Sequence, residues 1–274
     1  MLVLHRAIRN YLFICFFLIT CTLVGQDTSQ WQMIQVLPLQ NKTMQADRMG
    51  NFYVVTPSNQ LFKYNSNFER IATLNYTFSG SIDAVDVSNP LEIYLFYKEL
   101  NQVVLLDNNL AYRGKLNLTD WGITQAACIG RSFDNGIWIF DLGDFQLKKF
   151  DKTGNLIQSS GNCKQFIQTP QFVPIASIDD GNRVFLLDQV SGIYVFDVFG
   201  NFVKQIQMEG VPFVQPEKDI LYYLKDNSIY GLKAAGQKKL VFISNETGVS
   251  QFSVQDKHLI LGQPNQIKRF RHAE

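Results

Sequence analysis

Short runs of apolar residues recur along this chain at a regular interval, and one seven-residue pattern occurs six times. It consists of a polar or small pair, an aliphatic residue, two variable residues, an apolar residue and a polar residue, with one departure at Phe145. Successive aliphatic residues are 42, 44, 46, 36 and 38 positions apart, a spacing typical of four-stranded propeller blades. The aliphatic residues are Leu61, Val103, Leu147, Ile193, Ile229 and Ile267.

Each copy of this repeat is predicted to have further strands beside it. A strand rich in β-branched and aromatic residues precedes it, as at 183–187, and turns of Asp, Asn and Gly precede several of those strands. Strands with small residues at 81–87, 123–128 and 173–178 are predicted to lie innermost, where a ring is most crowded.

An outermost strand is predicted after each copy, but only five copies have one because the chain ends three residues after Arg271. Residues 31–39 supply the sixth from the other end. We therefore predict an all-β, six-bladed β-propeller of four-stranded blades, with the ring closed by the N-terminal mature strand completing the last blade. A sandwich or barrel also has short strands, but not six copies at this interval. Deleting residues 29–39 is expected to destabilise the last blade.

The first 25 residues have the features of a secretory signal peptide. Arg6 and Arg9 precede an uncharged apolar run at 11–25, which is shorter than the roughly 20 residues of a membrane-spanning helix. We predict a signal peptide at 1–25, a single propeller domain at 26–274, and an exported protein that is periplasmic or extracellular. An uncleaved anchor stays an alternative, and so does a lipoprotein, because the residues before Cys21 loosely resemble a lipobox.

Charge and composition limit the classes of partner. Without the signal peptide, the chain has 23 basic and 24 acidic residues, so its net charge is 23 − 24 = −1. No basic patch stands out, which argues against a nucleic-acid partner. Only His258 and His272 remain after cleavage, too few for a site with several histidine ligands. No membrane span is expected after cleavage, and we predict a monomer.

A few residues are candidates for binding chemistry. Asp83, Asp86 and Asn89 lie on or just after one predicted inner strand, and oxygen ligands of this kind can hold a divalent cation. Because positions 83 and 86 have opposite parity, only one of them faces the channel if the strand is regular. Asp179 and Asp180 end another inner strand. The alternative is that these residues form turns, so we predict no cofactor and leave a divalent cation open.

Three other side chains have two interpretations each. Trp121 falls between the second and third repeats, where it either stands in an exposed loop as a contact residue or fills the core between blades. Cys128 and Cys163 remain after signal cleavage. They either pair as a disulfide in an oxidising compartment or stay as two buried thiols.

The turn Asp-x-x-Gly-Asn occurs at 47–51, 151–155 and 197–201. Together with the repeated strands, it resembles NHL-like and TolB-like six-bladed propellers over residues 31–271, and the signal peptide is similar to that of exported propellers of Bacteroidetes-type bacteria. These motifs are structural and carry no catalytic signature. Because histidine is scarce, the net charge is near zero and the informative positions are all structural, we predict a non-catalytic module that binds an envelope protein or a small ligand. The resemblance implies an alternative, a lactonase-like hydrolase with a cation in the central channel.

Overall fold

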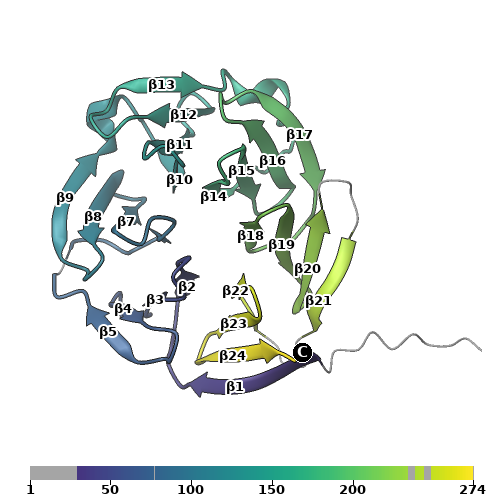
Figure 1. Ribbon diagram of the computed structural model, residues 1–274. Coiled ribbons are helices and arrows are strands. Elements are labelled where there is room, and N and C mark those ends of the chain that lie inside the picture. Colours follow the sequence, from purple (N-terminus) through teal and green to yellow (C-terminus); the bar gives the residue numbers. More distant parts are fainter. Residues whose placement is uncertain (1–29, 77, 234–237, 244–247, 274) are drawn as a thin grey trace, which may run out of the picture.

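A computed structural model describes residues 30–273, except 77, 234–237 and 244–247. Six sheets of four antiparallel strands each stand around a central axis (Figure 1). The predicted six-bladed propeller is therefore confirmed, whereas the predicted signal peptide lies outside the described residues.

The first three blades follow one another along the chain, each beginning with its innermost strand. Blade 1 consists of β2 (Thr43–Ala46), β3 (Phe52–Val55), β4 (Leu61–Tyr64) and β5 (Arg70–Thr73). Blade 2 consists of β6 (Ala84–Asp86), β7 (Glu92–Tyr97), β8 (Gln102–Asp107) and β9 (Tyr112–Asn117). Blade 3 consists of β10 (Ala126–Arg131), β11 (Ile137–Asp141), β12 (Gln146–Phe150) and β13 (Leu156–Ser159).

The remaining blades continue this order. Blade 4 consists of β14 (Pro174–Asp179), β15 (Arg183–Asp188), β16 (Gly192–Asp197) and β17 (Phe202–Gln207). Blade 5 consists of β18 (Val214–Glu217), β19 (Ile220–Lys225), β20 (Ser228–Lys233) and β21 (Lys238–Ile243). Blade 6 consists of β22 (Gln251–Gln255), β23 (His258–Gln263), β24 (Gln266–His272) and β1 (Trp31–Leu37). The 3-10 helices η2 (Leu118–Trp121) and η3 (Cys163–Gln165) are short, and no helix among the described residues is long and apolar enough to cross a bilayer.

The two ends of the chain meet in blade 6. Strand β1 pairs antiparallel with β24, from Trp31 opposite His272 to Leu37 opposite Ile267, and the two strands lie side by side in Figure 1. The indole of Trp31 also donates to the carbonyl of Val241 in blade 5, at 3.0 Å. The predicted ring closure is confirmed, and the closing strand also contacts the preceding blade.

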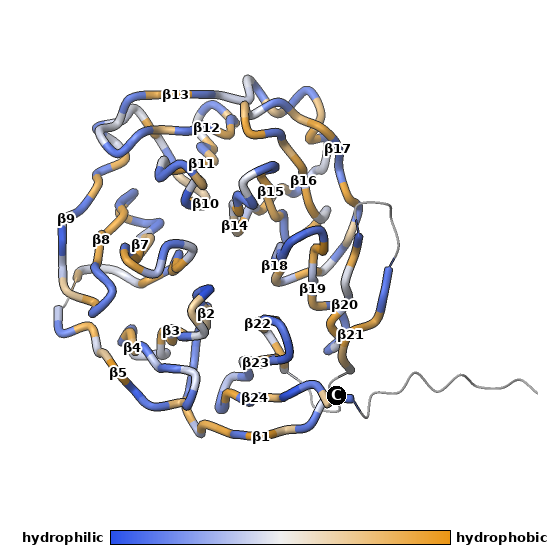
Figure 2. The backbone as a smooth tube through the Cα atoms, in the orientation of Figure 1, coloured by the Kyte–Doolittle hydropathy of each residue, from blue (hydrophilic) through white to orange (hydrophobic). Residues whose placement is uncertain are grey.

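The core is divided among the spaces between neighbouring blades. The second and third strands of a blade are covered on both faces, so β3 and β11 are buried along their whole length. Figure 2 shows apolar residues along these strands and hydrophilic residues at turns around the axis. Burial on both faces explains why these strands read as continuous apolar runs and lack strict alternation.

Aspartates at the ends of the third strands hold the turns that follow. Asp107, Asp151 and Asp197 each accept backbone N–H bonds from residues two and four positions later. The bond from the Ala111 N–H is the largest of several effects that hold the pKa of Asp107 below its usual value. The recurring aspartates are therefore part of the repeat, because an Asx turn needs a short acceptor at this point.

The innermost strands of blades 3 and 4 approach closely through a glycine. A Cβ atom added to Gly130 on β10 would lie 1.9 Å from the carbonyl oxygen of Ser177 on β14. No other residue type fits without moving backbone, so Gly130 sets the spacing of these two strands.

Candidate functional site

A cavity of about 650 Å³ runs along the axis of the ring. Residues of the innermost strand of every blade line it: β2, β6, β10, β14, β18 and β22. Its volume lies within the range of small-molecule sites. One face of the ring carries the turns that join first to second and third to fourth strands, because each blade is an antiparallel meander. We call this the turn face.

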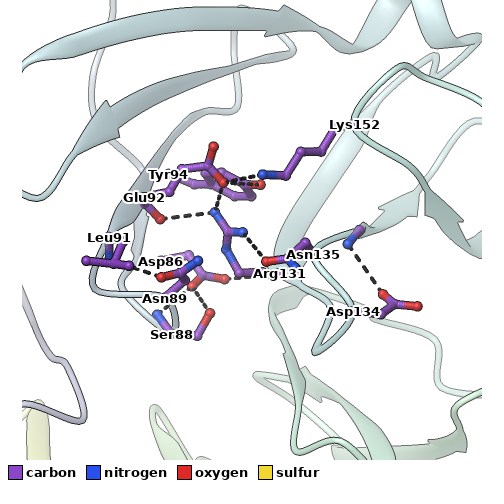
Figure 3. A network of polar contacts seen from close by, with 11 residues as sticks. Asp86, Ser88, Asn89, Leu91, Glu92, Tyr94, Arg131, Asp134, Asn135 and Lys152 are labelled. Carbon is purple, nitrogen blue, oxygen red and sulfur yellow. Dashed lines mark hydrogen bonds and ion pairs between the residues drawn. The ribbon is translucent and has the colours of Figure 1, made fainter.

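Arg131 is the centre of a polar network on the turn face between blades 2 and 3 (Figure 3). Its guanidinium is buried, donates to the Glu92 carboxylate at 2.5 Å, and lies 4.0 Å from the centre of the Tyr94 ring. Its backbone N–H donates to Asp86 at 2.6 Å. The network joins the two blades through groups that are far apart in sequence.

Glu92 is held as a carboxylate by this network. Burial alone would raise the pKa of Glu92, but hydrogen bonds from Arg131 and Lys152 outweigh burial and hold the pKa below its usual value. A carboxylate in this state accepts charge-assisted bonds and is a poor proton donor at neutral pH. Glu92 therefore has a structural role at the junction between blades 2 and 3.

Asp179 has a similar role between blades 3 and 4. One carboxylate oxygen accepts bonds from the Ser132 hydroxyl at 2.8 Å and from the Trp138 indole at 3.0 Å. The other oxygen accepts from the Gly181 N–H at 2.8 Å. Both carboxylate oxygens of Asp179, at the end of β14, thus accept hydrogen bonds from protein groups.

The structure separates the three residues grouped by the sequence. Strand β6 begins at Ala84, so Asp83 precedes it, contrary to the prediction that Asp83 lies on or after the strand. Asp83 accepts from the Lys98 N–H at 2.8 Å, whereas Asp86 accepts from the Ser88 N–H and hydroxyl. Asn89 accepts from the Leu91 N–H. Asp83 therefore lies just before the three-residue strand and bonds the turn after β7, whereas Asp86 ends the strand and bonds both Ser88 and Arg131 of blade 3.

The described residues contain no group of three or more His, Cys, Asp or Glu side chains placed to hold a metal ion. Asp180 also makes local bonds, to the N–H groups of Asn182 and Arg183. Four carboxylates on the cavity wall, those of Asp83, Asp86, Asp179 and Asp180, are therefore hydrogen-bonded within the fold.

Trp121 packs against the core between blades 2 and 3. Its ring lies 5.5 Å from that of Phe150, and a Cβ on Gly154 would lie 2.3 Å from its indole nitrogen. Of the two interpretations of Trp121, the structure has the one in which the side chain fills the space between blades.

Both cysteines are free and buried in the same apolar cluster of blades 3 and 4. The disulfide left open by the sequence is not formed in the structure. The Cys163 thiol lies 3.1 Å from the Ser160 hydroxyl, and burial raises the pKa of Cys128 to about 12. Both side chains are small members of the core.

Three successive turns at the cavity mouth carry exposed apolar side chains. Met49 in blade 1 is 67% exposed, Leu91 in blade 2 is 68% exposed and Phe133 in blade 3 is 60% exposed. The corresponding turns of blades 4, 5 and 6 are charged, with Asp180, Lys218, Asp219, Asp256 and Lys257. The sequence did not single out Met49, Leu91 or Phe133, although each lies in or beside a turn that the sequence predicts.

Phe133 is the best supported of these exposed side chains. Its N–H donates to Asp179, and the Lys149 ammonium lies 5.5 Å from the centre of its ring. Lys149 is itself buried and donates to Asp134 at 2.7 Å. The turn is held by Asp179 of blade 4 and by Lys149 of its own blade, so the Phe133 ring is exposed on a turn that is hydrogen-bonded on both sides.

No protein-family model matches the chain, and no curated protein matches its sequence. Streptogramin B lyase is similar in structure, with a TM-score of 0.63, 10% identity, and coverage of 88% of this chain and 97% of that chain. Virginiamycin B lyase from Staphylococcus aureus, with quinupristin, has a TM-score of 0.61 at 10% identity and covers 88% and 99%. The Neurospora crassa Pan2 WD40 domain has a TM-score of 0.62 at 8% identity and covers 90% and 99%. These likenesses show the propeller fold alone.

Proposed function

We propose that this chain is an exported, non-catalytic β-propeller that binds a protein of the cell envelope through its turn face. One observation carries the proposal. At the mouth of the cavity, Asp86 and Asp179 accept hydrogen bonds within the fold, while Met49, Leu91 and Phe133 expose their apolar side chains on successive turns.

Such side chains favour a macromolecular partner. Exposed apolar groups gathered at one surface are typical of interaction sites, and a few aromatic or aliphatic anchors supply much of the binding energy at interfaces. Phe133 is bonded through its turn to Asp179, so little conformational freedom is lost when it is covered. The charged turns of blades 4 to 6 supply the polar rim that fixes the partner's orientation.

Export, the envelope location and the monomeric state belong to the same proposal. They are supported by the apolar segment at 11–25, by the near-zero net charge without the signal peptide, and by a ring that has no unpaired inner strand. Both binding modules and lyases occur among the structural neighbours, so the fold alone does not decide between them.

The test is crosslinking and affinity capture of the tagged protein from its native envelope. The wild type is compared with a variant carrying Met49→Ser, Leu91→Ser and Phe133→Ser. A matched control carries Ile71→Ser, Tyr112→Ser and Ile157→Ser, which removes exposed apolar groups from outer strands. We expect the wild type and the control to capture the same partner and the turn-face variant to lose it. Absence of a reproducible partner, or equal capture by all three, would overturn the proposal.

A channel-centred hydrolase is the alternative, and metal analysis separates the two. Purified protein is dialysed against Ca²⁺, Mg²⁺ or Zn²⁺ and measured by mass spectrometry of the elements. A stoichiometric metal that is lost in Asp83→Asn or Asp86→Asn would favour the hydrolase. Because Asp83 and Asp86 already accept hydrogen bonds from backbone N–H groups, we expect no stoichiometric metal.

A further inference from the structure

A second cavity of about 270 Å³ lies between blades 4 and 5. It is bounded on one side by β15, β16 and β17 and on the other by β19 and β20, and it meets the turn face at Asp180 and Lys218. We call it the blade 4–5 pocket. It is separate from the exposed side chains of blades 1 to 3 on which the proposed function rests.

One position of the repeat explains why this space is open. The sixth residue of the seven-residue pattern is aromatic in blades 1, 3, 4 and 6, and leucine in blades 2 and 5. The residues are Tyr64, Leu106, Phe150, Phe196, Leu232 and Phe270. Each of the four aromatic rings contacts a second ring: Phe52, Trp121, Phe166 and Phe242 respectively.

The two leucines differ in their surroundings. Leu106 in blade 2 is fully buried in a cluster that includes Leu110. Leu232 in blade 5 is only partly buried and lines the pocket. The space that an aromatic pair fills elsewhere is therefore left between blades 4 and 5.

The floor of the pocket is apolar. Phe185 and Val195 of blade 4 and Leu221 of blade 5 are buried and line it. An apolar floor of this kind binds aliphatic or aromatic groups by removing their surface from water.

The rim of the pocket is positively charged. Arg183, Lys204, Lys218 and Lys233 line it together with Asp180 and Asp219, a balance of 4 − 2 = +2. Arg183 pairs with Asp180 at 3.1 Å, and Lys218 lies 4.0 Å from Asp256. Within the described residues, Lys204 and Lys233 have no carboxylate at ion-pair distance. Two ammonium groups are thus available to a ligand.

We infer that the blade 4–5 pocket binds a small organic anion, in which a carboxylate or similar group is attached to an apolar body. The apolar body lies against Phe185, Val195 and Leu221, and the anionic group meets Lys204 and Lys233. Neither part alone accounts for the site, because the buried floor residues carry no charge and the charged side chains stand at the rim.

Isothermal titration calorimetry with three eight-carbon probes tests this inference on the folded protein. Octanoate has the required charge, 1-octanol has none, and octylammonium has the opposite charge. We expect octanoate to bind at least tenfold more tightly than either of the others, and to weaken as salt is raised, because the ammonium groups are near the surface. Equal binding of the three probes, or no octanoate binding, would overturn the inference.

Two variants place the binding in this pocket. Leu232→Phe fills the space as other blades do, and Lys204→Gln with Lys233→Gln removes two charges. We expect each to weaken octanoate binding about tenfold, while Lys115→Gln, which removes an exposed lysine from β9, leaves it unchanged. If Leu232→Phe has a lowered melting temperature, the lysine variant and the salt dependence decide. Unchanged affinity in the lysine variant would contradict the inference, whereas capture of a partner at the turn face tests only the proposed function.

Discussion

The junction between blades 3 and 4 and the junction between blades 4 and 5 are made from the same repeat but closed by different side chains. In the first, Gly130 allows close backbone approach, and Asp179 bonds Ser132 and Trp138 across the gap. In the second, Leu232 leaves a pocket whose rim carries Lys204 and Lys233, for which the described residues offer no carboxylate at ion-pair distance. The comparison shows that the strands define the ring, while a few junction residues decide where the ring is solid and where it can bind.

The largest expected effect comes from a substitution at Gly130, where the inner strands of blades 3 and 4 approach each other closely. Gly130→Ala would place a methyl group 1.9 Å from the Ser177 carbonyl oxygen, so backbone must move. We expect a loss of about 3 kcal/mol in the free energy of unfolding, measured in urea.

Gly231→Ala in blade 5 is the matched control. Its added methyl group would first meet the Ile220 side chain at 3.0 Å, which can move at lower cost, so we expect a loss of about 1 kcal/mol or less. Equal losses at the two glycines would mean that the junctions are equally adaptable.

A smaller loss in the free energy of unfolding is expected when the Arg131 network between blades 2 and 3 is broken. Arg131→Ala removes a buried guanidinium and leaves Glu92 with Lys152 as its remaining basic partner. We expect a loss of about 2 kcal/mol in urea unfolding, because one partner of a buried ion pair is then poorly compensated. Arg113→Ala is the control, since this arginine is largely exposed and its pair with Asp107 is worth about 0.5 kcal/mol.

Two further substitutions exchange the aromatic residue and the leucine at the sixth position of the repeat. Phe150→Leu in blade 3 leaves Trp121 without its ring partner, and we expect a loss of about 1 kcal/mol. Leu232→Phe in blade 5 should have the opposite sign and raise stability by about 0.5 kcal/mol, because it fills a pocket. Thermal unfolding of both variants checks the pair, and a destabilised Leu232→Phe would show that the pocket cannot accept a ring.

The smallest effect concerns pH. The folded pKa of Glu92 is held below its unfolded value of about 4.3, so its contribution to stability is complete above about pH 5. That contribution is lost as the pH falls through the folded pKa. We expect wild type to lose more stability than Glu92→Gln between pH 6 and pH 3.5, by less than about 1 kcal/mol. Equal losses of stability in wild type and Glu92→Gln, measured by urea unfolding at each pH, would show that the ionisation of Glu92 is not coupled to folding.

The repeat, the number of blades and the closing strand were predictable from the sequence. The seven-residue pattern and the turn chemistry are local, so residues such as Asp151 and Asn155 indicate a turn wherever they occur. The candidate site was less predictable. Asp83 and Asp86 appeared as neighbours on one strand, yet Asp83 accepts a bond from Lys98 of its own blade and Asp86 accepts one from Arg131 of the next blade.

The sequence by itself thus determined the blades and the order in which they follow one another, because both depend on contacts between neighbouring strands. Only the tertiary structure decided which side chains are free to bind. Arg131 meets Glu92 across 39 positions and Trp138 meets Asp179 across 41, so their bonding depends on how blades pack. The exposure of Phe133 and the opening beside Leu232 have the same origin, since each depends on what a neighbouring blade places against it.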